Sequence, residues 1–174
     1  MSLRPLKIIL LGDEKVGKTS LYDKYANSSF PSSYNPSSKA VFKKTIVNVT
    51  GESIDLQFWD TPGNEKKHQS YMSIYLKTNG IIVIFDLTNR KTFENILKKW
   101  IPNFFNFLKI KPSENIPVII LGNFNDLKDK RQISNKEIQT NLKEVTNFTN
   151  YYFYQEISIK NDKIPNFIKK YYYL

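Results

Sequence analysis

Uninterrupted runs of apolar residues alternate along this chain with segments whose apolar residues recur at helical spacing. Apolar runs of this length are typical of strands that are buried on both faces of a parallel sheet. They lie at residues 6–11, 80–87, 116–123 and 151–157. Two further segments, residues 40–49 and 53–59, flank Thr50-Gly51-Glu52 and predict a β-hairpin. The pattern therefore predicts six strands.

Helices are predicted between these strands. Helical spacing of apolar residues indicates three of them, at residues 17–26, 91–108 and 162–172. Ser134 and Glu137 form a capping box, so a further helix should start there. Pro102 has no N–H to donate, so we expect the helix that contains it to be bent or shortened. Because strands and helices alternate, the sequence predicts a single α/β domain over residues 1–174, with a six-stranded, mostly parallel sheet flanked by about five helices.

The net charge of +10 allows two interpretations. It fits an anionic partner, such as nucleic acid or a membrane surface. It also fits lysines scattered over solvated faces, because lysine, asparagine, isoleucine and tyrosine are all abundant, as codon bias would produce, and only three arginines occur. No stripe of basic and aromatic residues supports nucleic-acid binding, so we expect no nucleic-acid partner.

The chain contains no cysteine and no apolar run of about 18 residues, the length that a membrane span requires. The lack of cysteine excludes disulfides, cysteine-based zinc sites and thioether lipid anchors within this chain. We therefore expect a cytoplasmic protein that contacts membranes only peripherally, with no lipid anchor in this chain.

A phosphate-binding motif follows the first predicted strand. The pattern G-x-x-x-x-G-K-[ST] is met by Gly12, Gly17, Lys18 and Thr19. The glycines let backbone N–H groups face phosphate oxygens, the lysine adds a charge, and the threonine hydroxyl can bind Mg²⁺. The simpler alternative is a glycine-containing turn with a surface lysine. The position between a strand and a helix favours the phosphate loop of a P-loop NTPase.

Three more elements follow predicted strands. In "WDTPGNE", residues 59–65, Asp60 can hold Mg²⁺ and Gly63 can offer its N–H to a terminal phosphate. In "LGNFND", residues 121–126, the Asp126 carboxylate can accept from both N1–H and the amino group of guanine, a donor pair that adenine lacks. The fourth element is "EISIK", residues 156–160, at the end of the last strand.

In this order and spacing, the four elements resemble those of the Ras-like small GTPases, and most of all the Rab branch with its late-endosomal members. The resemblance covers nearly the whole chain. It implies a small G protein that binds GTP and GDP with Mg²⁺. The nucleotide ligands that it implies are Lys15, Val16, Gly17, Lys18, Thr19, Ser20, Phe30, Asn123, Phe124, Asp126, Ser158, Ile159 and Lys160. The Mg²⁺ ligands that it implies are Thr19, Ser37 and Asp60, and the catalytic residues are Gly63 and Asn64.

The resemblance also implies partners. An exchange factor, a GTPase-activating protein and effectors would contact two switch regions, Tyr34–Phe42 and Asp60–Tyr75. Rab effectors read an aromatic cluster that matches Phe42 and Trp59, with Ile74 as its third member here. We expect a monomer that switches vesicle traffic and lies on endomembranes if a lipidated tail is missing from this chain.

The chain departs from the family at the expected catalytic site. Asn64 replaces a water-positioning glutamine and is one methylene shorter, and Pro62 stiffens the turn before it. We therefore expect slow GTP hydrolysis. The alternative is a scaffold that binds guanine nucleotide without hydrolysing it. Glu14 replaces a small residue, either as a solvated carboxylate or as an obstacle to an incoming arginine.

Two further departures concern the base and the first switch. Phe124 replaces the lysine of the N-K-x-D motif, and we hypothesise that Lys15 reaches toward it and restores a cation beside the base. An exposed Lys15 is the simpler alternative. Ser37 keeps the Mg²⁺-binding hydroxyl but loses a methyl group, which reduces packing of the GTP-bound loop.

Overall fold

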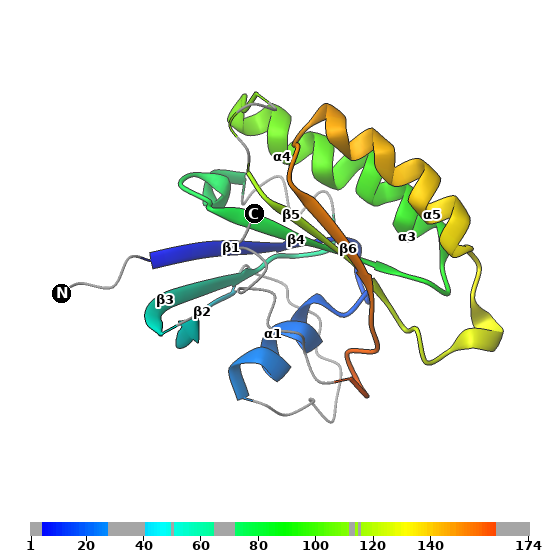
Figure 1. Ribbon diagram of the computed structural model, residues 1–174, viewed down its shortest axis with the longest axis horizontal. Helices are drawn as coiled ribbons and strands as arrows, with labels where there is room; N and C mark the ends of the chain where they lie inside the picture. The colour runs from blue at the N-terminus through cyan, green and yellow to red at the C-terminus, as the bar shows by residue number, and fades with distance from the viewer. Residues whose placement is uncertain are drawn as a thin grey trace.

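A six-stranded sheet forms the centre of the molecule (Figure 1). The structure, a computed structural model, describes residues 5–27, 41–49, 51–64, 72–111, 114 and 116–162. The strand order is β2-β3-β1-β4-β5-β6, and every neighbouring pair is parallel except the β2–β3 hairpin. The strands are β1 (Pro5–Leu11), β2 (Val41–Val49), β3 (Glu52–Asp60), β4 (Gly80–Asp86), β5 (Val118–Asn123) and β6 (Tyr152–Glu156). The predicted strands, hairpin and mostly parallel sheet are confirmed.

Helices cover both faces of the sheet. Figure 1 shows α1 (Lys18–Asn27) on one face and the remaining long helices on the other. The latter are α3 (Arg90–Asn95), η2 (Ile96–Trp100), α4 (Ile101–Leu108), α5 (Asn135–Asn141) and η5 (Leu142–Asn147). Two short 3₁₀ turns complete the described elements, η1 (Met72–Tyr75) and η4 (Lys128–Lys130). The helix expected at residues 162–172 lies almost wholly outside the described residues. None of the described helices is long and apolar enough to cross a membrane.

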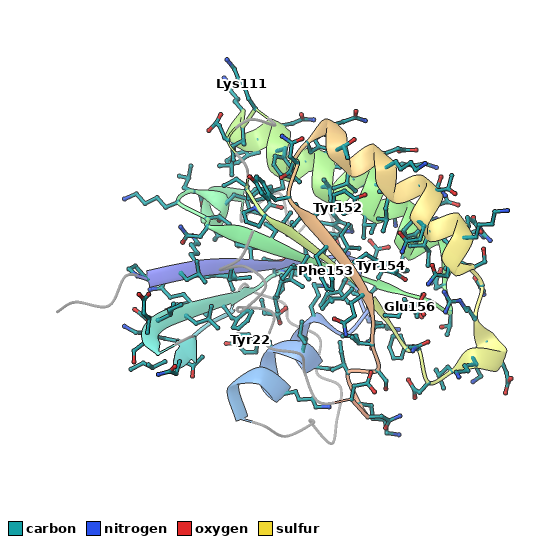
Figure 2. All side chains as sticks on the ribbon, viewed as in Figure 1. Tyr22, Lys111, Tyr152, Phe153, Tyr154 and Glu156 are labelled. Atoms are coloured by element: carbon teal, nitrogen blue, oxygen red, sulfur yellow. The ribbon has the colours of Figure 1, made fainter. Side chains whose placement is uncertain are left out.

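The alternation of side chains along the strands divides the core into two clusters. In β1, Ile9 and Leu11 pack beneath α3, α4 and α5, whereas Ile8 and Leu10 pack against the α1 side. The edge strand β6 follows the same rule: Tyr152 and Tyr154 contact the first cluster, and Phe153 contacts the second (Figure 2). Burial on both faces explains why the central strands have continuous apolar sequences.

The helix that contains Pro102, which was expected to be bent or shortened, is not shortened. The helical path runs from α3 through η2 into α4 and ends at Leu108. η2 is a π-helical turn, in which the N–H of Ile101 donates to the carbonyl of Ile96 rather than to the residue four positions back. This wider turn precedes Pro102 directly, so the proline enters the first turn of α4, where its missing N–H is tolerated.

The predicted start of α5 is confirmed. The Ser134 hydroxyl accepts a hydrogen bond from the backbone N–H of Glu137 at 3.2 Å, as an N-cap does. The Glu137 carboxylate pairs with Arg90 of α3. The capping residues therefore start α5 and also join it to the helix that packs beside it.

Candidate functional site

The expected phosphate loop wraps around the side chain of Lys18. Its ammonium donates to the carbonyl oxygens of Gly12 at 2.9 Å and Asp13 at 2.7 Å. The residue is 6% exposed, and burial lowers the pKa of Lys18 to about 8, against the opposing pull of the Asp60, Asp13 and Glu14 carboxylates. The loop thus holds a buried cation at its centre, where it can meet a phosphate.

Asn123 joins this loop to the end of β5 and to the segment after β6. Its side-chain amide donates to the Val16 carbonyl at 2.9 Å, and its side-chain oxygen accepts from the Ile159 N–H at 3.0 Å. Gly17 makes the close approach possible: its φ is +106°, and a Cβ there would lie 2.5 Å from the Asn123 side-chain nitrogen. One buried side chain therefore brings together three segments of the expected nucleotide site.

Thr19 and Asp60 have the geometry of a shared metal position. The Thr19 hydroxyl donates to the Asp60 carboxylate at 2.7 Å. Both are hard oxygen donors that suit Mg²⁺. No group of three or more histidine, cysteine or acidic side chains that could hold a metal occurs among the described residues. The oxygens of Thr19 and Asp60 fit a Mg²⁺ ion that would take its remaining ligands from phosphate and water, as is usual for this ion.

The expected catalytic residues Gly63 and Asn64 lie in the segment that follows β3, and this segment packs against the phosphate loop. The buried Thr61 hydroxyl donates to the Leu10 carbonyl at 2.6 Å, which fixes this segment to the end of β1. A Cβ on Gly63 would lie 2.4 Å from the backbone nitrogen of Glu14, so no larger residue fits there without a shift. Asn64 follows and is half-buried, whereas the Glu14 side chain is exposed.

The expected base-binding residues surround the ends of β5 and β6. Phe124 is half-buried and has a φ of 67°, and Asp126 is exposed. The Asp126 carboxylate accepts from the Asn161 side-chain amide at 3.3 Å. Ser158 and Ile159 are buried, and Lys160 is exposed. The topology thus brings the two segments that are expected to bind the base into contact.

The hypothesised contact between Lys15 and Phe124 is not present. Lys15 is exposed, and the cation–π contact in the described part of the chain is between Lys7 and Trp59, with 4.6 Å from ammonium to ring centroid. The simpler alternative, an exposed Lys15, therefore holds.

Phe42 and Trp59 form an aromatic pair on the β2–β3 hairpin. Their ring centroids are 5.0 Å apart, and Phe42 is 44% exposed. Ile74 is half-buried and packs, like Trp59, against the core beneath α3 and α4. Phe30, Ser37, most of Tyr34–Phe42 and residues 65–71 lie outside the described residues, so the other expected switch positions stay predictions.

Sequence reasoning missed the attachment of the phosphate loop to α3 and η2. The two carboxylate oxygens of Asp13 accept from the Trp100 indole N–H at 2.8 Å and from the Asn95 side-chain amide at 2.6 Å. The two donors are five residues apart, which is the spacing of a π-helical turn rather than an α-helical one. A helical pattern of period 3.6 gives no signal for this pair.

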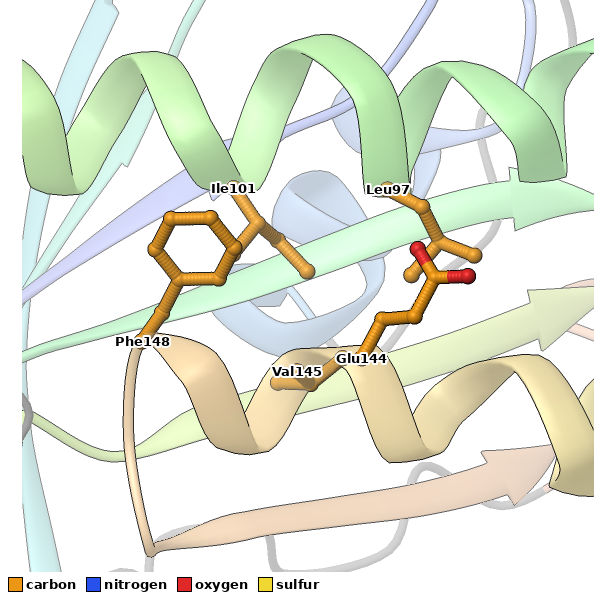
Figure 3. A pocket seen from close by; sticks show the side chains of 5 residues that line it. All are labelled: Leu97, Ile101, Glu144, Val145 and Phe148. Atoms are coloured by element: carbon orange, nitrogen blue, oxygen red, sulfur yellow. The ribbon is translucent and has the colours of Figure 1, made fainter.

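A small apolar cleft lies away from these loops. It is lined by Leu97, Ile101, Glu144, Val145 and Phe148, between the α3–α4 helix and η5 (Figure 3). This is the face of the sheet opposite α1. Its lining includes none of the expected nucleotide ligands.

Comparisons with known proteins agree with this geometry. The sequence matches the model of the Ras family over residues 7–170. The chain belongs to the Ras family. It is 33% identical to the Rho-related GTP-binding protein RhoD of Homo sapiens over 146 residues, which are 83% of this chain and 66% of that protein.

Two Rab proteins are similar to the same degree. The chain is 33% identical to Ras-related protein Rab-8B of Pongo abelii over 159 residues, 84% of this chain and 74% of the relative. It is 36% identical to the Ypt/Rab-type GTPase Rab7 of Gibberella zeae over 136 residues, 78% of this chain and 66% of the relative. By family this protein is a Ras-like small GTPase, and the chain spans 66–74% of the length of these three relatives.

Proposed function

We propose that this Ras-family protein is a Rab-type switch in vesicle traffic with slow GTP hydrolysis. The observation that carries the proposal is the packing of Gly63 against the phosphate loop, with Asn64 next in the chain. An asparagine there must orient the attacking water with a side chain that is one methylene shorter than glutamine.

The residues of the loop take separate roles in this proposal. Lys18 binds the outer phosphates and Asn123 holds the loop in shape, while Asp126 selects guanine. Thr19 and Asp60 would hold Mg²⁺, which would supply positive charge to neutralise the phosphates. Gly63 donates its N–H to the terminal phosphate, and Asn64 orients water. When the terminal phosphate is lost, the switch segments lose that contact and change conformation.

Replacing Asn64 tests the hydrolysis step. Asn64→Gln restores the missing methylene, so single-turnover GTP hydrolysis with Mg²⁺ should speed up by about ten- to hundredfold. Asn64→Ala is the matched control and should be no faster than the natural protein. A glutamine variant that is no faster would remove the stated reason for slow hydrolysis.

The alternative is a scaffold that binds GTP without hydrolysing it. Three departures from the family favour it, at Asn64, Phe124 and Ser37. Activating proteins of the Rab branch can supply both arginine and glutamine in trans. The natural protein should therefore hydrolyse GTP when the catalytic domain of such an activating protein is added, whereas a scaffold would retain GTP in its presence.

The Rab branch is supported by the Rab relatives and by the exposed Phe42 beside Trp59. The similarity to RhoD would support a Rho-type switch instead. GDP release catalysed by Rab-type but not by Rho-type exchange factors would favour the first assignment.

The nucleotide that co-purifies with the protein, identified by chromatography after denaturation, should be GDP or GTP. Purification with ATP would contradict both assignments.

A further inference from the structure

Lys24 in the last turn of α1 reaches into the segment that follows β6. Its ammonium donates to the carbonyl oxygens of Ile159 at 2.6 Å, Lys160 at 3.2 Å and Asp162 at 2.6 Å. An ammonium has three N–H donors, so these three carbonyls use its whole capacity. The three acceptors come from one five-residue turn, residues 158–162, and none of them is a carboxylate.

Three backbone N–H groups of this turn bond within the turn itself and not to the three carbonyls that face Lys24. The Ser158 N–H donates to the Asp162 carboxylate at 2.6 Å, and the Asp162 N–H donates to the Ser158 carbonyl at 2.8 Å. The Asn161 N–H also bonds to Ser158. These bonds close the turn on itself and leave several carbonyl dipoles directed toward Lys24. A positive charge there offsets their mutual repulsion.

The same turn also contacts Asp126, which is proposed to select guanine, and Asn123, which is proposed to hold the phosphate loop in shape. The Ile159 N–H donates to Asn123 at 3.0 Å, and the Asn161 side chain donates to Asp126 at 3.3 Å. A displacement of the turn would therefore disturb both residues. Ser158 and Ile159 are buried, whereas Lys160, Asn161 and Asp162 are exposed, so the turn is anchored at its start and its end faces solvent.

α1 connects this turn to the phosphate end of the site. The helix begins with Lys18 and Thr19, and Lys24 lies six residues later, about 9 Å along the axis. A single short helix thus carries the phosphate-binding lysine at its start and the contact to the base-covering turn near its end. The two halves of the site are held at a fixed separation.

We propose that Lys24 is a positioning residue that holds the turn of residues 158–162 closed over bound guanine and thereby sets how long the nucleotide stays bound. This inference rests on the proposed guanine site at Asn123 and Asp126. The nucleotide leaves only when the turn opens, and opening breaks the contacts of the ammonium with three carbonyls.

The test compares Lys24→Met, which keeps the apolar stem and removes the charge, with Lys24→Arg, which keeps a cation and its donors. Release of fluorescently labelled GDP is followed after addition of excess unlabelled GDP, with Mg²⁺ present. Lys24→Met should release GDP about ten- to hundredfold faster, because charge-assisted hydrogen bonds are lost. Lys24→Arg should stay within about threefold of the natural protein. Lys98→Met removes an exposed helical lysine and should change nothing.

Local opening distinguishes positioning from a general loss of stability. Amide hydrogen exchange of the GDP-bound Lys24→Met variant should speed up in residues 158–162 and remain unchanged in β4. If that variant fails to fold, Lys24→Gln, which keeps a donor but no charge, replaces it and should also release GDP faster. If the natural protein binds GDP and the methionine or glutamine variant releases GDP at the same rate as the natural protein, this inference is wrong and the proposed function still stands. Natural protein that binds neither GDP nor GTP would overturn the proposed function and this inference with it.

Discussion

Two residues of the candidate site adopt a backbone conformation that normally favours glycine. Lys15 has a φ of 66° and Phe124 a φ of 67°. For a residue with a Cβ, this left-handed conformation costs about 1–2 kcal/mol. Strain of this kind is concentrated at functional sites and persists only where the surrounding structure imposes it. Both residues belong to the loops that are proposed to contact nucleotide, and Phe124 stands at a position where the chain departs from the family motif.

Replacing Lys15 by glycine should therefore stabilise the protein. Glycine removes the strain of about 1–2 kcal/mol. It also gives the unfolded chain more conformational freedom, which costs about 0.5–1 kcal/mol of stability. The free energy of unfolding should therefore rise by roughly 0.5–1 kcal/mol. Lys15→Ala is the control, because alanine removes the charged stem but keeps the strained Cβ. Urea unfolding of the three proteins measures the difference. A glycine variant that is less stable than the alanine variant would show that the backbone is not strained.

The charge of Lys18 should change when nucleotide binds. With a pKa of about 8, roughly half of the empty molecules carry a neutral amine at pH 8. Bound phosphates favour the ammonium, so GDP binding at pH 8 should take up about half a proton, and at pH 7 about a tenth. GDP affinity should consequently fall as the pH rises through 8. Calorimetry in buffers of different ionisation enthalpy measures the uptake, and equal values at the two pH values would contradict the lowered pKa.

Between elements, the attachment of the phosphate loop to the neighbouring helix makes a testable contribution to stability. Trp100→Phe keeps an aromatic ring but removes the N–H that the Asp13 carboxylate accepts. A double-mutant cycle with Asp13→Ala should give a coupling free energy of about 1.5–3 kcal/mol, as expected for a hydrogen bond to a charged group. Denaturant unfolding followed by far-ultraviolet circular dichroism avoids the loss of the tryptophan signal.

The outcome of that cycle has a clear alternative. If the two substitutions are additive to within about 0.3 kcal/mol, the carboxylate and the indole do not stabilise one another. Lys143→Ala, on the exposed surface of η5, combined with Asp13→Ala gives a matched pair without contact and should be additive.

The elements themselves could be predicted because their signals are local. Continuous apolar runs indicated β1, β4 and β5, and Ser134 with Glu137 indicated the start of α5. The π-helical turn could not be predicted, since nothing in a 3.6-residue period indicates a turn with a longer spacing. Its last residue, Trp100, is 3% exposed and packs in a core cluster with residues distant in the sequence, and such contacts are not visible in a local pattern.

For the molecule as a whole, motifs located the candidate site, but its internal connections depend on tertiary contacts. The spacing of the glycines, Lys18 and Thr19 predicted a phosphate loop. Phosphate binding by such a loop depends on residues that are close together in the sequence, so the sequence carries a signal for it. The contacts of Lys24 with Ile159 span 135 residues, and those of Asp13 with Trp100 span 87. Residues that hold a site together across such distances have no local signature, so only the fold shows them.

An ion pair between the segment after β5 and the end of β6 should make the stability of the whole domain depend on pH. Arg131 binds the Glu156 carboxylate with two hydrogen bonds of 2.7 Å, and the Tyr154 hydroxyl donates to it at 2.9 Å (Figure 2). The hydrogen bonds from Arg131 lower the pKa of Glu156 below its usual 4.5, and burial opposes them only in part. The charged carboxylate is therefore favoured in the folded state.

The sign of the pH dependence follows from this lowered pKa. The stabilisation is complete above the pKa of the unfolded chain, near 4.5, and is lost as the pH falls through the pKa of the folded protein. Between pH 6 and pH 3, the natural protein should lose more free energy of unfolding than Glu156→Gln, which cannot titrate. Urea unfolding at several pH values measures both, with Glu144→Gln, an exposed position, as the control. If the free energy of unfolding of Glu156→Gln falls by as much as that of the natural protein between pH 6 and pH 3, the ion pair does not contribute to the acid sensitivity of the fold.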